Sequence, residues 1–305
     1  MNILCVSAYD CAGVGYALTE AVNMTTPHSM RCISQKIHPF GYPCDMLESS
    51  GNITRSDYQR VLKSADVVLF ASSYNEYRPF GIPIPDRIPK AIWHGGNIYR
   101  LNYKRFNEQI HPKMVAVYAH KDLYKLGKDI VCLQAPYPTH KYSLEEKPKD
   151  GFVITHSPST ASTKGTEHFV EAIDELKRQY GDIIKEKLIK DVSFRESIKM
   201  KKDAHFFFDQ IANVTLPPNG GKGYGVSLME AGAFGCVGMG WTDWDDTPIY
   251  TVNNAYDIVD VVSGLIDDPD RLDREINRMY RFIHYEHSYA TIAEKFVKPL
   301  ERELG

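Results

Sequence analysis

Short runs of apolar residues recur along the chain, and between them lie stretches whose apolar residues repeat with the period of a helix. In the first half, the runs of strand length are Ile3 to Val6, Arg31 to Ser34, Val67 to Ala71, Lys90 to Trp93, Met114 to Tyr118 and Ile130 to Leu133. Continuous rather than alternating apolar runs are typical of parallel strands that helices cover on both faces. The pattern therefore predicts one α/β unit in the first part of the chain.

The pattern begins again after a polar, proline-bearing segment at residues 143–151, which is the best linker candidate. A strand is expected at Phe152 to Thr155. The helix after it is indicated by apolar residues at i, i+3, i+4 and i+7, namely Phe169, Ala172, Ile173 and Leu176. This restart predicts a second α/β unit.

The second unit is expected to contain two more strands, at Ala204 to Asp209 and at Cys236 to Met239. A helix is predicted over residues 269–283, with Asp268 in place to cap it. A final helix follows Ser288.

These elements predict three parts of the chain. Residues 1–145 form an N-terminal Rossmann-like domain, residues 151–285 form a second such domain, and residues 286–305 form a helix that we expect to pack back on the first. Because open parallel sheets bind ligands at the carboxyl ends of their strands, a ligand shared by two such domains is expected in a cleft between them.

The composition is that of an average soluble globular chain, with 43% apolar and 25% charged residues among 305. The 36 Lys and Arg against 39 Asp and Glu give a net charge of −3, which argues against a general basic surface for nucleic acid but leaves a local basic groove open. The six cysteines show no CxxC pair, so we expect them to be reduced and structural. No signal peptide or membrane-length apolar run is present, and we expect a cytoplasmic protein.

The segment from Asn219 to Gly235 has four glycines in six residues, followed by a helical pattern. Such a loop is expected to leave backbone amides bare at a helix start, where a phosphate binds favourably. Glu230 lies one to two turns into the helix, and its carboxylate can accept the 2- and 3-hydroxyls of a ribose. The alternative is an ordinary glycine-rich surface loop with Glu230 solvated.

A second segment, from Thr155 to Glu167, reads as a strand end, a small polar loop and then Lys164-Gly165 at the start of an amphipathic helix. A lysine held at such a loop is a point charge suited to a diphosphate. The alternative is a solvated surface lysine.

Together the two segments resemble the retaining glycosyltransferases of the GT-B architecture, specifically the large group-1 family. In that family a Lys-Gly pair opens the first helix of the second domain, matched here by Lys164 and Gly165, and the lysine contacts the donor diphosphate. The stretch from Gly223 to Gly240 resembles the family's glycine loop and helix, whose glutamate, Glu230 here, binds the nucleotide ribose. The other donor contacts that the resemblance implies are Gly223, Tyr224, Gly225, Val226, Ser157 and Gly165.

The resemblance extends to the first domain. The loop with Gly13, Val14 and Gly15 is similar to the family's glycine loop after the first strand, which faces donor phosphate and acceptor. A dinucleotide fingerprint is disfavoured there because Leu18 stands at its last glycine position. His94 closes a strand before two glycines, so we expect it to contact a sugar or acceptor hydroxyl, with a core histidine as the alternative.

One departure concerns the transferred sugar. The family usually has a second glutamate eight residues before the ribose-binding one, and Lys222 stands in that place. Because a lysine accepts no hydrogen bonds from hydroxyls, another group binds the sugar, the sugar carries negative charge, or the activity is altered.

The resemblance implies two Rossmann-like domains facing each other across a cleft, and transfer of a sugar from a nucleotide donor to an acceptor hydroxyl with retention. A UDP-sugar is the favoured donor, no metal or other cofactor is expected, and Lys164, His94 and Lys222 are the expected catalytic residues. The acceptor is a glycan, a lipid-linked sugar or a small molecule. Two alternatives stay open: modification of a nucleic acid, such as a hydroxymethylated base of phage DNA, and a catalytically silent nucleotide-sugar-binding protein.

Overall fold

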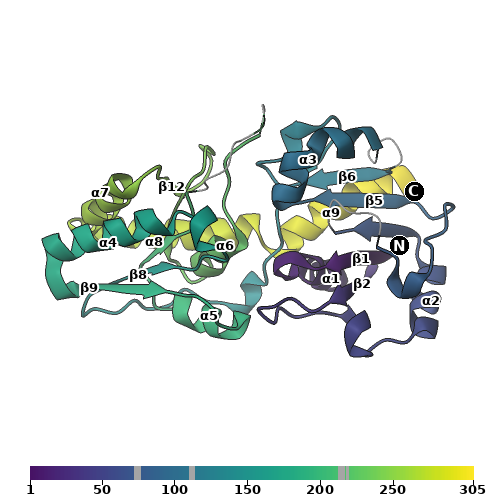
Figure 1. Cartoon of the computed structure of the whole chain (residues 1–305), viewed down its shortest axis with the longest axis horizontal. Coiled ribbons are helices and arrows are strands. Elements are labelled where there is room, and N and C mark those ends of the chain that lie inside the picture. The colour runs from purple at the N-terminus through teal and green to yellow at the C-terminus, as the bar shows by residue number, and fades with distance from the viewer. Residues whose placement is uncertain (72–76, 110–113, 212–216, 218–219) are drawn as a thin grey trace. The chain divides into compact units, whose positions relative to one another are not determined.

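The computed structural model describes residues 1–71, 77–109, 114–211, 217 and 220–305. The chain divides into two compact units (Figure 1). Unit 1 comprises residues 1–138, 216–220 and 288–305, and unit 2 comprises residues 139–215 and 221–287. Each unit is a parallel sheet with helices packed on it, which confirms the α/β class predicted from the apolar runs.

Unit 1 is built on a sheet of seven strands in its described residues, in the order β3-β2-β1-β4-β5-β6-β7, and all the neighbouring pairs are parallel. Its strands are β1 (Asn2–Tyr9), β2 (Ser29–Lys36), β3 (Met46–Leu47), β4 (Val67–Phe70), β5 (Lys90–His94), β6 (Ala116–Ala119) and β7 (Val131–Cys132). Strand order reverses between β1 and β4, where parallel α/β sheets usually bind ligands.

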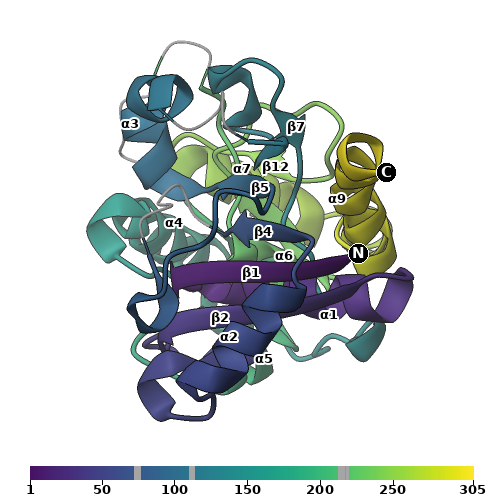
Figure 2. The same ribbon diagram turned by 90° about the vertical axis from the view of Figure 1, so that its right-hand side faces the viewer.

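Helices cover both faces of this sheet (Figure 2). One face packs against α1 (Val14–Thr25) and α9 (Tyr289–Leu304), and the other against α2 (Arg55–Ser64) and α3 (Gly96–Gln109). Successive residues of β1 point to opposite faces, so Ile3 joins the first cluster and Leu4 the second. Burial on both faces explains why the strands appear in the sequence as continuous apolar runs.

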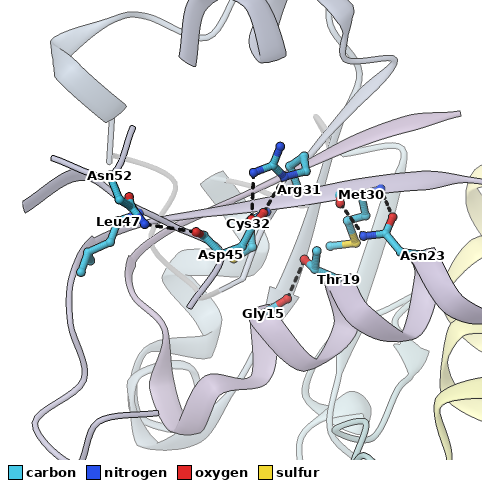
Figure 3. Close-up of polar contacts among 9 residues, drawn as sticks. All are labelled: Gly15, Thr19, Asn23, Met30, Arg31, Cys32, Asp45, Leu47 and Asn52. Carbon is cyan, nitrogen blue, oxygen red and sulfur yellow. Dashed lines mark hydrogen bonds and ion pairs between the residues drawn. The ribbon is translucent and has the colours of Figure 1, made fainter. Parts of the chain in front are cut away.

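Short polar side chains fix β2 against its neighbours (Figure 3). The Asn23 amide on α1 accepts from the N–H of Met30 at 2.7 Å and donates to its carbonyl oxygen at 2.9 Å. Asp45 receives two hydrogen bonds from the Arg31 guanidinium, each 2.8 Å, and one from the N–H of Cys32 at 3.0 Å. These contacts set the start of β2 and hold the segment that returns as β3.

Unit 2 has a five-stranded sheet in the part of the chain that the structure describes, in the order β12-β11-β10-β8-β9 and again entirely parallel. Its strands are β8 (Phe152–His156), β9 (Ile184–Leu188), β10 (Phe206–Phe208), β11 (Val237–Gly240) and β12 (Tyr250–Thr251). Its helices are α4 (Thr166–Tyr180), α5 (Phe194–Lys201), α6 (Val226–Gly232), α7 (Ala255–Ile266) and α8 (Pro269–Glu286).

The core of unit 2 lies between the sheet and α4, α7 and α8. Val237 and Met239 of β11 face this cluster, whereas Gly238 points to the opposite face. A Cβ at Gly238 would lie 3.2 Å from the Leu228 side chain, so α6 packs closely on that opposite face. This close packing sets the place where α6 begins, at the carboxyl end of the sheet.

The predicted strands are all found, with ends that differ by a few residues. The Asp268 carboxylate accepts the N–H of Arg271 at 3.0 Å, which confirms it as the cap of α8. The pattern of the sequence did not predict β3, β9, β12, α2, α3, α5 or α7. None of the six cysteines forms a disulfide, as expected; Cys5, Cys32 and Cys236 are buried, Cys44 and Cys132 are partly exposed, and Cys11 is exposed.

In the described residues, every helix is too short or too polar to cross a bilayer.

Candidate functional site

The loops at the carboxyl end of the unit 2 sheet are joined through one side chain, Gln210. It lies two residues beyond the end of β10. Its Oε1 accepts a hydrogen bond from the Lys164 ammonium, and its Nε2 donates to the carbonyl oxygen of Gly223 at 3.0 Å. The two segments that the sequence analysis singled out, around Lys164 and around Gly223, are therefore brought together within unit 2.

Gly165 allows the Lys164 loop to pass close to the β10 end. Its φ of +68° lies in the left-handed region, where it forms the N-cap of α4. A Cβ at this position would lie 2.9 Å from the carbonyl oxygen of Ile211. The N–H of Ile211 donates in turn to the Lys164 carbonyl at 3.3 Å. A glycine is thus required here both for its dihedral angle and for space.

His156 at the end of β8 contacts Thr166, the first residue of α4. Its Nδ1 lies 2.9 Å from the Phe208 carbonyl oxygen, which can only accept, so Nδ1 carries the proton. Burial lowers the pKa of His156 to about 4, so the ring is neutral near pH 7 and Nε2 accepts from the Thr166 hydroxyl at 3.0 Å. Ser157, the next residue along the chain, is partly exposed at this edge.

Asp209 anchors the glycine-rich loop. Its carboxylate is 4% exposed and accepts the N–H of Gly225 at 2.8 Å. Burial raises the pKa of Asp209, and the positive charge of Lys164 and the Gly225 hydrogen bond oppose that rise. The carboxylate thus holds the loop at the point where α6 begins, and Val226 as the first residue of α6 is partly exposed.

The glycine-rich loop differs from the expectation of bare amides. The N–H of Gly225 is bound by Asp209, that of Gly220 donates to the Pro217 carbonyl at 2.9 Å, and that of Lys222 donates to Asp243 at 3.3 Å. Since α6 has only seven residues, its dipole adds little. Asn219, where the segment starts, lies outside the described residues.

Glu230 is buried in an ion pair. Its side chain on α6 is 1% exposed and its Oε2 contacts the ammonium of Lys201, which is 0% exposed at the end of α5. The alternative of a solvated Glu230 is therefore wrong. Removal of one partner from such a pair leaves an uncompensated charge and costs about 3–5 kcal/mol.

Lys222 and Tyr224 project from the loop toward aromatic neighbours. The Lys222 ammonium lies 4.8 Å from the centre of the Trp241 ring and 3.4 Å from Oδ1 of Asn253. The Tyr224 ring packs edge to face on Trp244 at 4.8 Å, and its hydroxyl lies 2.8 Å from Nε2 of the buried His287. Both residues are partly exposed, so the loop presents a cation and an aromatic ring.

In unit 1, the loop with Gly13, Val14 and Gly15 begins α1 at the carboxyl end of β1. Gly13 has a φ of +66°. The Asp10 carboxylate accepts the N–H of Gly15 at 2.7 Å and that of Tyr16 at 2.9 Å. The Asp10 carboxylate thus binds two backbone N–H groups in the first turn of α1. A role for this loop in binding phosphate or acceptor stays a prediction.

His94 lies in the core of unit 1. It is 0% exposed and stacks on the Tyr99 ring at 3.9 Å with an angle of 5° between the planes. This is the geometry of the core histidine that was kept as the alternative. A catalytic role for His94 stays a prediction.

Several polar residues of the site were not predicted. Asp209, Gln210 and His156 each follow or end an apolar strand, and that position is the signal that points to them. Asp10, directly after β1, has the same signal, whereas Lys201 at the end of α5 has none. Among the described residues, His, Cys, Asp and Glu form no group of three that could hold a metal ion.

No protein-family model matches this sequence, and no curated protein matches it either. Solved structures do. HepE from Anabaena in complex with UDP and glucose aligns with a TM-score of 0.64 and 10% identity, over 99% of this chain and 100% of that one. UDP-GlcNAc 2-epimerase from Neisseria meningitidis bound to UDP-GlcNAc aligns with a TM-score of 0.57 and 12% identity, over 99% and 100%. S. aureus MnaA with UDP aligns with a TM-score of 0.57 and 14% identity, over 100% and 97%.

At these identities the likeness shows the fold. The chain consists of two Rossmann-like units of the GT-B architecture. Membership of the retaining group-1 family stays a prediction.

Proposed function

We propose that this protein binds a nucleoside diphosphate sugar in unit 2 and transfers the sugar to an acceptor hydroxyl, as a retaining glycosyltransferase. The observation that carries the proposal is the contact between Lys164, Gln210 and Gly223, because it joins the cation and the glycine loop at the carboxyl edge of one sheet. The fold supports it, since HepE from Anabaena was solved with UDP-glucose. UDP is therefore the nucleotide to test first.

In this proposal, Lys164 neutralises the diphosphate and Gly165 allows the close loop that places it. Ser157 and the loop from Gly223 to Val226 surround the nucleotide, and Glu230 accepts hydrogen bonds from the ribose. Lys222 faces the sugar and favours one with a negative charge, because an ammonium group can only donate.

The chemistry needs no side chain as base. The bond between the anomeric carbon and the diphosphate oxygen breaks, and the charge that develops on the leaving phosphate is stabilised by the Lys164 ammonium. The leaving phosphate oxygen takes the proton of the acceptor hydroxyl as the new glycosidic bond forms on the same face. The groups that carry the reaction are therefore a cation and the donor itself.

A second candidate is a protein that binds the nucleotide sugar without transfer. Lys222 favours it, because this residue stands where the resembling family has a sugar-binding glutamate. Both candidates predict the same nucleotide site.

Thermal unfolding with UDP, other nucleoside diphosphates and UDP-sugars tests the proposal. A ligand at 100 times its Kd should stabilise the protein by about 2.7 kcal/mol, a shift of several degrees for units of this size. Lys164→Met is expected to lose most of the shift. Lys177→Met on α4, the helix that follows Lys164, is the control, because Lys177 is exposed and pairs with Glu186.

Product analysis by mass spectrometry then separates the two candidates. Release of UDP with a glycosylated acceptor supports transfer, whereas binding without product over a broad acceptor panel supports the second candidate. No shift with any nucleotide in the wild type would contradict both.

A further inference from the structure

Lys201 is a fully buried lysine on a polar helix. It is the last residue of α5, and its side chain is 0% exposed. The ammonium contacts Oε2 of Glu230, lies 3.4 Å from the Ser227 hydroxyl and lies 5.5 Å from the centre of the Phe207 ring. An ammonium group in such surroundings needs a compensating anion, and Glu230 supplies it.

The pair belongs to the same charged cluster as the candidate nucleotide site. Burial raises the pKa of Asp209; the positive charges of Lys164 and Lys201 oppose that rise, and the negative charge of Glu230 adds to it. Asp209 also binds the N–H of Gly225, in the loop that Gln210 ties to Lys164. The Lys201–Glu230 ion pair is thus close to Asp209 and to the glycine loop that Asp209 holds, and not in a separate part of unit 2.

We propose that Lys201 is a positioning residue that holds the Glu230 carboxylate turned toward the hydroxyls of the nucleotide ribose. The proposal rests on the proposed function. Because Glu230 is only 1% exposed, the direction in which its carboxylate points decides whether a ligand can reach it. A single ammonium bound to one of its oxygens limits rotation of the carboxylate. The ion pair would then select ribose over deoxyribose nucleotides.

The test compares the Kd of UDP with that of 2′-deoxy-UDP by calorimetry. A hydroxyl bound to a carboxylate contributes roughly tenfold or more in affinity, so the wild type is expected to prefer UDP by about that factor. Lys201→Met is expected to reduce the preference to near one, and Glu230→Gln to reduce it in the same way. Lys199→Met is the control, since Lys199 lies on the same helix with 63% of its side chain exposed.

If Lys201 only stabilises the fold, a different result is expected. Lys201→Met would then lower the melting temperature while the ratio of the two Kd values stays at its wild-type value, and that result overturns the proposal. If Lys201→Met does not fold, Lys201→Arg decides the question. Its larger, planar group keeps the charge but displaces the carboxylate, so a lower preference supports the proposal and an unchanged preference overturns it.

The wild type itself separates this proposal from the proposed function. Equal affinity for UDP and 2′-deoxy-UDP overturns the role of the ion pair and leaves nucleotide binding intact. Absence of binding to either nucleotide overturns both.

Discussion

The close approach of the Lys164 loop to the end of β10 can be tested at Gly165. We predict that Gly165→Ala destabilises unit 2 and weakens nucleotide binding. A Cβ at this position would lie 2.9 Å from the Ile211 carbonyl oxygen and 3.0 Å from the Ile211 Cβ. Both distances are shorter than van der Waals contact, and neither the carbonyl oxygen nor the Cβ of Ile211 can move away by a side-chain rotation.

The expected loss has two parts. An alanine in the left-handed region costs about 1–2 kcal/mol, and reduced freedom of the unfolded chain returns about 0.4–1 kcal/mol of that. The steric part resembles overpacking of a core and adds about 1–3 kcal/mol. The total for Gly165→Ala is therefore about 1–5 kcal/mol.

Gly51→Ala is the matched control, because it isolates the first part. Gly51 has a φ of +70° and Gly165 a φ of +68°, but no atom lies within 4 Å of a Cβ built at Gly51. Urea unfolding followed by circular dichroism should show a loss of about 1 kcal/mol for Gly51→Ala. If both variants lose the same free energy of unfolding, the Lys164 loop does not approach Ile211 as described.

Two further predictions concern unit 1. Burial raises the pKa of Asp10 to about 6. Between pH 4 and pH 6 the folded state therefore keeps a proton that the unfolded state has lost. The free energy of unfolding should fall by up to about 3 kcal/mol as the pH rises through this range. Asp10→Asn should lack this component, so urea unfolding of both proteins across this pH range should give a difference that changes with pH; a constant difference would contradict the pKa shift. Phe296→Ala should destabilise unit 1 by about 3–5 kcal/mol, because Phe296 is 0% exposed in the cluster that α9 shares with the sheet. Calorimetry should show a much smaller change for Tyr256→Ala, whose side chain is 77% exposed, and equal changes would contradict the packing of α9.

Most of the strands that the sequence predicted are at least four residues long and buried along most of their length. Val67 to Phe70 is buried at every position, so a plain apolar run identifies it. β9 has the sequence Ile-Lys-Glu-Lys-Leu and lies at the edge of its sheet, so only one of its five residues is buried. Partial burial removes the apolar signal, and β9 was missed for that reason.

Site residues that belong to a local sequence motif could be predicted, whereas residues whose contacts are distant in the sequence could not. Lys164 and Gly223 stand in recognisable local patterns, yet the residue that joins them, Gln210, is known only from the fold. Lys201 on a polar helix looks like a solvated lysine, and its partner Glu230 is 29 residues away. Pairing between separate elements leaves no trace in a local pattern.

The packing of α9 on unit 1 has a consequence for synthesis on the ribosome. Its residues Tyr289, Phe296 and Leu300 share a core with β1 and α1, yet they are translated after all of unit 2. Until then, the sheet of unit 1 has an uncovered apolar strip on one face. We therefore expect the nascent chain to complete unit 2 before unit 1, and a ribosome-stalled chain that ends before residue 288 should depend on chaperones for solubility.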